Sequence, residues 1–426
     1  MEEAPFVMNS TRAHASPTRR SSLGASYGKL WVSSSLSNLA DGIVRIALPL
    51  MAVQVTRSPA LIAGLTIALT IPWLLFALHA GAMADRLDRR KVMLTANAAR
   101  VALLAGLVLL VVLGTGSIWA LYAVAFCLGT AETIYDTAAQ SILPQIVHRD
   151  RLSRANGRLY AAELTANEFI GPPLAGLLMA AGVAVAFTAP AIMWILAVAP
   201  LLLVRGSFRI DREGGTSLRA DIAEGLRFLW RHRLLRTLAV MVGVFNFATN
   251  AVLAVFVLYA VGPESAMRLP EPAFGLLLTA IAAGSLCGSL AAERIERLLG
   301  RARSLVTAFA CGALLVGVPA ATTHPLPTGA GFFIGGAGIV LWNVVTVSLR
   351  QRITPDRLLG RLNSGYRLVA WGTRPLGAAA GGLLASVFGL RAVFATMAVL
   401  ILLLIAGMRT VTDDDMDTAE REAGHA

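Results

Sequence analysis

Long apolar runs alternate with short polar segments along almost the whole chain. Twelve runs have about the length needed to cross a bilayer, because about 30 Å of hydrocarbon takes about 20 residues of helix. The pattern predicts an all-α membrane protein with transmembrane helices at residues 31–54, 61–79, 92–113, 118–142, 155–180, 185–204, 238–261, 274–292, 305–320, 329–349, 365–388 and 393–408.

Composition supports a membrane protein over a soluble one. Of the 426 residues, 56% are hydrophobic and 15% are charged, which is more apolar sequence than a soluble core uses in such runs. Residues 1–29 hold no apolar run, so we expect no cleavable signal peptide. The three cysteines lie in apolar runs without ligand spacing, and we therefore expect no disulfide, metal or cofactor.

The positions of the basic residues predict the orientation. The net charge of +12 could suggest a nucleic-acid partner, but most Lys and Arg residues fall in the two tails and the even-numbered loops. The odd-numbered loops hold only Arg57, Arg268 and Arg391. Because basic loops stay on the cytoplasmic side, we predict a multi-pass protein of the inner (plasma) membrane with both termini in the cytoplasm. Its partner is the lipid bilayer, not nucleic acid.

A repeat divides the chain into two halves. Residues 150–157, Asp-Arg-Leu-Ser-Arg-Ala-Asn-Gly, return at 356–364 as Asp-Arg-Leu-Leu-Gly-Arg-Leu-Asn-Ser. Such an offset implies two pseudo-symmetric six-helix bundles, an organisation that places transporter sites near the membrane midplane. We predict a disordered tail (1–29), a first bundle (30–204), a linker with an amphipathic helix on the inner membrane surface (205–236), a second bundle (237–409) and a disordered acidic tail (410–426), in a monomer.

Polar stripes inside the predicted helices mark candidate chemistry, since ionisable groups in hydrocarbon are normally paired or face water. Asn38, Asp41 and Arg45 share one face of the first helix. Glu163 and Glu168 point to different faces of the fifth helix, so at most one should face a cavity. The other stripes are Glu132, Tyr135, Asp136 and Gln140 in the fourth helix and Asn156, Tyr160, Glu163 and Asn167 in the fifth.

The carboxylates of these stripes are candidates for proton coupling. Asp41 lies about 15 Å deep at about 1.5 Å per residue, where burial disfavours its charged form and Arg45 favours it. The alternative is a permanent Asp41–Arg45 ion pair that only orders the helix. Glu132 and Asp136 present the same choice, and Arg100 could neutralise one of them. We expect one static pair and one titrating acid.

The eleventh predicted helix carries a cationic, aromatic face. Arg367, Trp371 and Arg374 recur at i, i+4 and i+7. This face could bind an anionic or aromatic ligand, since guanidinium groups pair with carboxylates and stack on rings. It could equally pair with the loop at residues 81–91 or with an acid of the other half.

Two motifs resemble the major facilitator superfamily. Residues 81–91 follow the order small-x-x-x-Asp-Arg-x-x-Arg-Arg-Lys of its loop between helices 2 and 3, with Asp88 in place of Gly and Met83 in place of Leu. Residues 171–176 resemble its antiporter-associated Gly-Pro-x-x-Gly-Gly motif, while the Arg of a further motif is missing from residues 121–130. The resemblance implies a conformational hinge at Gly81, Asp85, Arg86, Arg89, Arg90 and Lys91 and close helix packing at Gly171, Pro172 and Gly176.

Together with Asp41-Gly-Ile, Ala131-Glu132-Thr and residues 150–157, these motifs look like the enterobactin-exporter and macrolide-efflux branch over about residues 30–409. Helices 1, 4, 7 and 10 line the central cavity in that family. The resemblance, with the stripes above, implies a substrate cavity lined by Asn38, Arg45, Tyr135, Glu163, Asn246, Asn250, Trp342, Asn343, Trp371 and Arg374.

These features predict a transporter and not an enzyme. The chain has no Gly-x-x-x-x-Gly-Lys-Ser/Thr sequence, so direct drive by ATP is not expected. We predict alternating-access export of a small amphiphilic drug, siderophore or secondary metabolite in exchange for protons, coupled by Asp41, Glu132 or Asp136. Asp85 and Arg86 would help to close the outward-facing state near the start of the eleventh helix. Uptake by symport or facilitation, or a non-transporting receptor or assembly subunit, are the alternatives.

Overall fold

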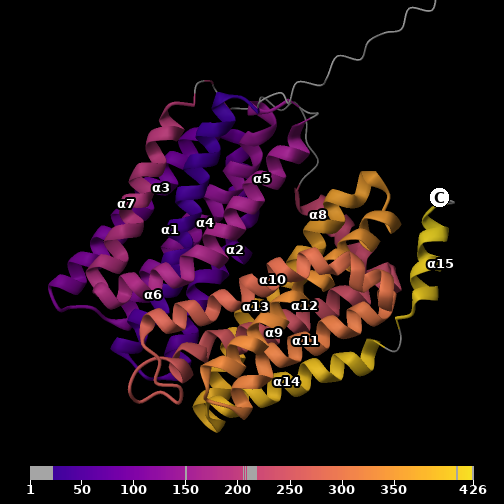
Figure 1. Cartoon of the computed structure of the whole chain (residues 1–426). Helices are drawn as coiled ribbons and strands as arrows, with labels where there is room; N and C mark the ends of the chain where they lie inside the picture. The colour runs from indigo at the N-terminus through magenta and orange to yellow at the C-terminus, as the bar shows by residue number, and fades with distance from the viewer. Residues whose placement is uncertain are drawn as a thin grey trace, which may run out of the picture.

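The computed structural model describes residues 23–148, 151–204, 206, 208, 218–408 and 411–424, almost all of them helical. Figure 1 shows long helices in two groups, α1 to α7 and α9 to α14. The elements are α1 (Ala25–Val55), α2 (Pro59–Arg86), α3 (Arg89–Val112), α4 (Ile118–Ile146), α5 (Leu152–Leu164), the π-helix η2 (Thr165–Ile170), α6 (Gly171–Ala181), α7 (Val183–Leu202), α8 (Leu218–Arg231), α9 (Arg233–Ala260), α10 (Glu271–Leu299), α11 (Arg301–Ala321), α12 (Pro325–Ile353), α13 (Asp356–Phe388), α14 (Leu390–Gly407) and α15 (Asp413–Gly424).

Ten of the described helices are long and apolar enough to cross a membrane, namely α1 to α4, α7, α9 to α12 and α14. The predicted helices at 155–180 and 365–388 are not among them. The first divides into α5, η2 and α6, and the second lies in α13, whose charged residues include Arg361, Arg367 and Arg374. The structure therefore confirms an all-helical, multi-pass chain, while the count of twelve stays a prediction.

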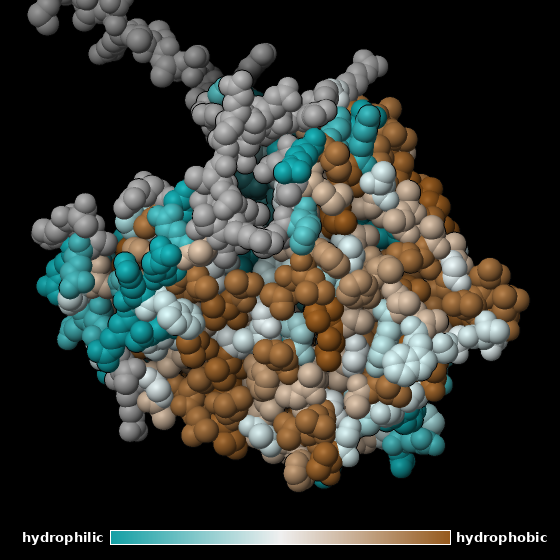
Figure 2. All heavy atoms as spheres, turned by 180° about the vertical axis from the view of Figure 1, so that it is seen from behind, coloured by the Kyte–Doolittle hydropathy of each residue, from teal (hydrophilic) through white to brown (hydrophobic). Residues whose placement is uncertain are grey.

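The two groups are each held together by neighbouring helices. In the first, α1 packs against α6 and α7, α2 against α4, and α3 against α4 and α7. In the second, α10 and α11 pack against α12, α9 against α13, and α11 against α14. Figure 2 shows brown, apolar side chains over a broad part of the surface, with teal polar ones nearer its edges. This distribution suits a protein whose outer surface contacts lipid.

The two groups approach each other closely near the beginnings of α2 and α10. A Cβ atom on Gly176 of α6 would lie 2.3 Å from the Glu271 carbonyl oxygen of α10. A Cβ atom on Gly382 of α13 would lie 2.5 Å from the Ala63 Cβ of α2. In the same region, Arg57 donates a hydrogen bond to the Val261 carbonyl at 3.2 Å. These contacts all lie toward the odd-numbered loops.

The linker helix α8 was predicted to lie on the inner membrane surface, but it contacts the second group. In α8, a Cβ atom on Gly225 would lie 2.0 Å from the Arg361 carbonyl oxygen, so α8 packs directly against α13. Glu224 forms an ion pair with Arg361, and Leu229 is fully buried. Among the described side chains of this helix, Leu229 and in part Leu226 therefore pack against protein.

The prediction of a disordered acidic tail is wrong for residues 413–424, which form α15. Met416 is fully buried against the protein, and Arg301 of α11 forms ion pairs with Asp417 and Glu420. Acidic composition suggests disorder in isolation, but basic partners on the second group stabilise the helix. At the other end, α1 begins at Ala25, within the predicted tail, and the tail residues 1–22 lie outside the described residues.

Candidate functional site

A buried ion pair lies at the centre of the first group. The Arg100 Nη1 atom is 3.3 Å from the Asp41 Oδ2 atom, and it donates hydrogen bonds to Ser37 Oγ at 3.0 Å and Asn97 Oδ1 at 3.2 Å. Arg100 is 0% exposed and Asp41 is 8% exposed. A buried charge is tolerated when it is paired and hydrogen-bonded. The geometry therefore pairs Asp41 with Arg100 inside the first group.

Two aromatic rings enclose the same guanidinium group. Its carbon lies 5.0 Å from the ring centre of Tyr135 on α4 and 5.3 Å from that of Trp194 on α7. Tyr135 is 1% exposed, so it supports this buried pair from inside the bundle, in contrast to its predicted place on a cavity surface. Cation–π contacts of this kind stabilise a desolvated guanidinium group.

A second ionic cluster is open to solvent. The Arg45 Nη2 atom lies 2.9 Å from Glu132 Oε1 on α4, and its Nη1 atom lies 3.3 Å from Glu168 Oε1 on η2. The three side chains are 44%, 30% and 51% exposed, respectively. Asp41 and Arg45 thus have different partners, and the predicted alternative of an ion pair between them is wrong. The carboxylates of this cluster are thus more exposed than that of Asp41.

The π-helix explains why Glu168 reaches Arg45. Pro172 and Pro173 have no N–H, so they leave helical carbonyls four residues earlier without their usual donors. The chain widens instead into η2, where the Gly171 N–H bonds to the Ala166 carbonyl, five residues back. The residues of η2 therefore point to other faces than a period of 3.6 residues per turn predicts. Sequence periodicity placed Glu163 and Glu168 on different faces and favoured Glu163 for the cavity, whereas Glu168 is the one that pairs with Arg45.

Glycines place η2 against α1. A Cβ atom on Gly42 would lie 2.8 Å from the Asn167 Cα atom, and one on Gly171 would lie 2.8 Å from the Gly42 carbonyl carbon. Asn167 also donates a hydrogen bond to Asn38 Oδ1 at 3.1 Å. Asn38 therefore orients η2, and the motif residue Gly171 permits the close approach that brings Glu168 to α1.

In the second group, the two predicted cavity residues of α9 make hydrogen bonds to backbone carbonyls. Asn246 donates to the Ala370 carbonyl of α13 at 2.8 Å, and Asn250 donates to the Asn246 carbonyl at 2.9 Å. Trp342 is 6% exposed with its ring 4.6 Å from that of Phe309, which places it in the core instead of on the predicted cavity wall. Asn343 is exposed. Asn246 thus links α9 to α13, Asn250 bonds within α9, and Trp342 packs in the core.

The cationic face of α13 is present, and it contacts one residue of α2 that the sequence did not suggest. The Arg367 and Arg374 guanidinium carbons lie 4.4 and 4.7 Å from the ring centre of Trp371. Trp73 of α2 completes the group, with its ring 4.9 Å from that of Trp371 and 5.7 Å from the Arg367 guanidinium. We call these four residues the cationic stack. Trp73 was missed because its partner lies in the other half of the chain.

Opposite charges face each other between the two groups. The carboxylates of Glu163 and Asp136 lie near enough to attract the charge of Arg367, and that of Glu168 attracts Arg374, whereas the cation Arg45 repels Arg374. Asp136 is half-buried. The first group thus presents carboxylates to the guanidinium groups of the second. Within the described residues, no three His, Cys, Asp or Glu side chains gather in a way that could hold a metal ion.

The predicted hinge between α2 and α3 is held to the end of α7. Asp88, the residue that replaces the family's Gly, accepts from the backbone N–H groups of Arg90 at 3.0 Å and Lys91 at 3.3 Å, and from that of Phe208 at 3.4 Å. Arg90 donates to the Leu202 carbonyl at 2.9 Å. Asp88 thus caps α3, and Arg90 caps α7, where a cation is favoured.

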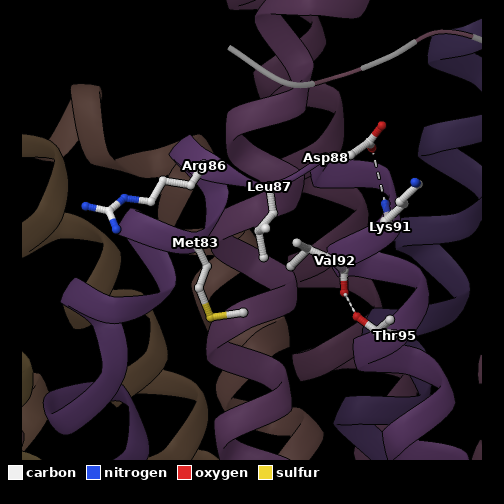
Figure 3. Close-up of a pocket in the computed structure, with 7 residues that line it drawn as sticks. All are labelled: Met83, Arg86, Leu87, Asp88, Lys91, Val92 and Thr95. Carbon is white, nitrogen blue, oxygen red and sulfur yellow. Dashed lines mark hydrogen bonds between the residues drawn. The ribbon is translucent and has the colours of Figure 1, made fainter. Parts of the chain in front are cut away.

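A cavity of about 430 Å³ opens beside this hinge, lined by Met83, Arg86, Leu87, Asp88, Lys91, Val92 and Thr95. Figure 3 shows Arg86 extending away from Asp88 and Lys91. Arg89 is buried at 3% exposure, and Gly81 is half-buried. The side chain of Asp85 lies outside the described part of the chain. Its predicted role in closing the molecule therefore stays a prediction.

Known proteins share this architecture. A structure of a bacterial homologue of the iron transporter ferroportin in the inward-facing state aligns with a TM-score of 0.72 at 18% identity, covering 92% of this chain and 99% of that one. A point mutant of the nucleoside transporter NupG also aligns with a TM-score of 0.72, at 11% identity, covering 90% and 99%. At these identities the likeness shows the fold alone.

Sequence comparison shows the family. The model of the transmembrane secretion effectors matches residues 19–424. The multidrug efflux pump Tap of Mycolicibacterium fortuitum is 30% identical over 382 residues, which cover 85% of this chain and 90% of the relative. The enterobactin exporter EntS of Salmonella typhi is 25% identical over 338 residues, covering 78% and 79%. The chain is therefore a multi-pass membrane transporter of small molecules, not an enzyme, and belongs to the transmembrane secretion effector family, in the efflux branch of the major facilitator superfamily.

Proposed function

We propose that this protein exports small amphiphilic compounds by alternating access, in exchange for protons. The observation that carries the proposal is the contrast between two ionic clusters on α1, one sealed and one open. A helix bundle that did not change conformation would need only the sealed pair Asp41–Arg100. Charged groups within a membrane cost stability and usually have a function. The open cluster of Arg45, Glu132 and Glu168 therefore takes part in the transport cycle in this proposal.

The proposed architecture has twelve spans in two bundles. The segment α5–η2–α6 and the helix α13 would supply the two spans beyond the ten apolar helices, since α13 has 33 residues and its charged face can turn inward. Close contacts toward the odd-numbered loops, as between Gly176 and Glu271, support a closed external side. With both termini and the even-numbered loops in the cytoplasm, the described conformation is inward-facing, in a monomer in the inner membrane.

Glu132 is the residue we assign to proton coupling, with Asp136 nearby. Protonation of Glu132 would remove the charge that holds Arg45 at 2.9 Å and loosen the link between α1 and α4. Since only a difference between the two states can shift their populations, the cluster must be intact in one and open in the other. Asp41 would keep Arg100 in place throughout. This assigns the expected static pair and titrating acid to particular residues.

The cargo class is supported by the names of the relatives. One is a multidrug efflux pump and another an enterobactin exporter, so we propose a drug or siderophore with polar and apolar parts. Half-exposed carboxylates, guanidinium groups and tryptophan rings on facing helices could hold such a molecule.

The test uses the full-length protein in proteoliposomes with an imposed pH gradient and a panel of fluorescent drugs that includes ethidium and norfloxacin. Glu132→Gln should abolish transport driven by the gradient while counterflow of the same drug continues. The matched control is Glu293→Gln, which removes an acid of 82% exposure on α10 and should transport normally. Full gradient-driven export by Glu132→Gln would contradict the coupling role.

The same vesicles separate the other functions. Accumulation of the drug on the proton-rich side would support export by exchange, and movement with the protons would instead mean symport. Equal movement with and without the gradient would indicate a facilitator. No counterflow of any drug would favour a receptor.

A further inference from the structure

Among the described residues, the cationic stack has no anionic partner within ion-pair distance. Arg45 and Arg100 each lie within 4.0 Å of a described carboxylate, but neither Arg367 nor Arg374 has a described carboxylate that close. The Nε atom of Arg374 is also buried without a hydrogen-bond acceptor in the described part of the chain. A guanidinium group at membrane depth is costly unless a partner compensates its charge.

The rings beneath these cations are only partly covered. Trp73 and Trp371 are both half-buried, and Arg367 is exposed, so the cationic stack is partly accessible where α2 and α13 meet. The described acids whose charges act on the stack, Glu163 and Glu168 among them, belong to the first group and act from beyond ion-pair distance. An incoming anion would meet two cations and two rings at the stack, with these carboxylates farther away on the first group.

We propose that the cationic stack is the binding subsite for an acidic, planar aromatic part of the exported compound, such as an aromatic carboxylate. The inference rests on the proposed export function and names its substrate class. A carboxylate can accept two parallel hydrogen bonds from one guanidinium group, which a neutral amide of the same shape does less well. The attached ring can stack on tryptophan.

The experiment measures equilibrium binding of radiolabelled 2-naphthoate to the full-length protein in nanodiscs, without any gradient. Its neutral analogue 2-naphthamide has almost the same shape. The native protein should bind naphthoate at least about tenfold more tightly than naphthamide, and Arg374→Gln should remove that preference. The control Arg297→Gln removes an equal charge from a residue with 73% side-chain exposure and should keep it.

Two further variants separate charge from stacking and guard against misfolding. Arg374→Lys keeps the charge but loses the planar fork, so it should retain only part of the preference for naphthoate. Trp371→Leu should weaken naphthoate and naphthamide together. Near-native thermal unfolding of Arg374→Lys would show that the fold tolerates change at this position.

Some results would overturn the inference. It fails if the native protein binds the two compounds equally or binds neither, or if Arg374→Gln keeps the native preference. Because binding needs no gradient, its outcome is independent of the vesicle assay. Selective naphthoate binding without gradient-driven transport would reject the proposed function alone. Normal export of other drugs without selective binding would reject the subsite alone.

Discussion

The two halves of the molecule compensate the cations between their helices differently. In the first, the guanidinium groups of Arg45 and Arg100 are paired with carboxylates. In the second, Arg350 lies 4.0 Å from the ring centre of Tyr366, and Arg374 lies over Trp371. A carboxylate can gain a proton and release its partner, whereas a tryptophan ring cannot. Arg45 and Arg100 of the first half thus have carboxylate partners, whereas Arg350 and Arg374 of the second have no described carboxylate within ion-pair distance.

The largest expected effect tests this difference directly. Arg100→Met leaves the Asp41 carboxylate buried and unpaired, which should cost about 3–5 kcal/mol of stability. Arg350→Met in the second half removes a cation that rests on a ring and should cost about 2 kcal/mol or less. Thermal unfolding of the purified proteins in detergent gives the comparison.

The rescue variant sharpens the same comparison. Asp41→Asn in the Arg100→Met background removes the stranded charge and should recover part of the lost stability. Arg45→Met is the control within the first half, because its cluster is half-exposed and should lose only about 0–1 kcal/mol. Equal losses in Arg100→Met and Arg350→Met would contradict the view that the halves differ.

A second contrast concerns the loops that enter α3 and α11. Asp88 caps α3 with its own side chain. Gly300 holds the equivalent position before α11 at a φ of 80°, a conformation that disfavours any residue with a side chain. The carboxylate comes instead from Asp413 at the start of α15, whose Oδ1 atom accepts from the Ala302 N–H at 2.9 Å. The C-terminal helix therefore supplies a cap that the loop cannot.

This contrast predicts a medium effect. Asp413→Ala should lower stability by about 1 kcal/mol, close to the loss for Asp88→Ala, since each leaves a helix N-terminus without its carboxylate. Asp414→Ala, which removes an exposed neighbour, should change little. The check is thermal unfolding at low salt, with native α15 content verified by limited proteolysis. A loss at Asp414 as large as that at Asp413 would mean that charge alone, and not the cap, matters.

Some features of the structure could be predicted from the sequence and others could not. The apolar runs predicted the ten helices that are long and apolar enough to cross a membrane, because a continuous run of apolar residues over the length of a helix is a strong signal. The ion-pair partners were harder to predict, because they depend on how each helix is rotated about its axis. Asp41 is four residues from Arg45 yet pairs with Arg100 of another helix. Glu168 needed a π-helix that breaks the 3.6-residue period, and Trp73 needed contact between the halves.

The smallest effect concerns the first helix of each half. Among described residues, α1 follows Gly24 with no side-chain cap, whereas α9 follows His232, whose Nδ1 atom accepts from the Leu235 N–H at 3.5 Å. Burial lowers the pKa of His232 from its usual 6.5, while Glu422 partly opposes this change. The cap needs the neutral imidazole, because a protonated Nδ1 cannot accept a hydrogen bond.

The sign of the pH dependence follows from that lowered pKa. A base that is harder to protonate when folded contributes its full stability above pH 6.5, and the contribution falls as the pH drops through the folded pKa. Between about pH 7 and pH 5 the native protein should therefore lose slightly more stability than His232→Asn, whose amide can cap at both pH values. The difference should stay below about 1 kcal/mol, as expected for a partly exposed cap. Parallel unfolding temperatures of the two proteins across this range would show that His232 does not stabilise α9 through its neutral form.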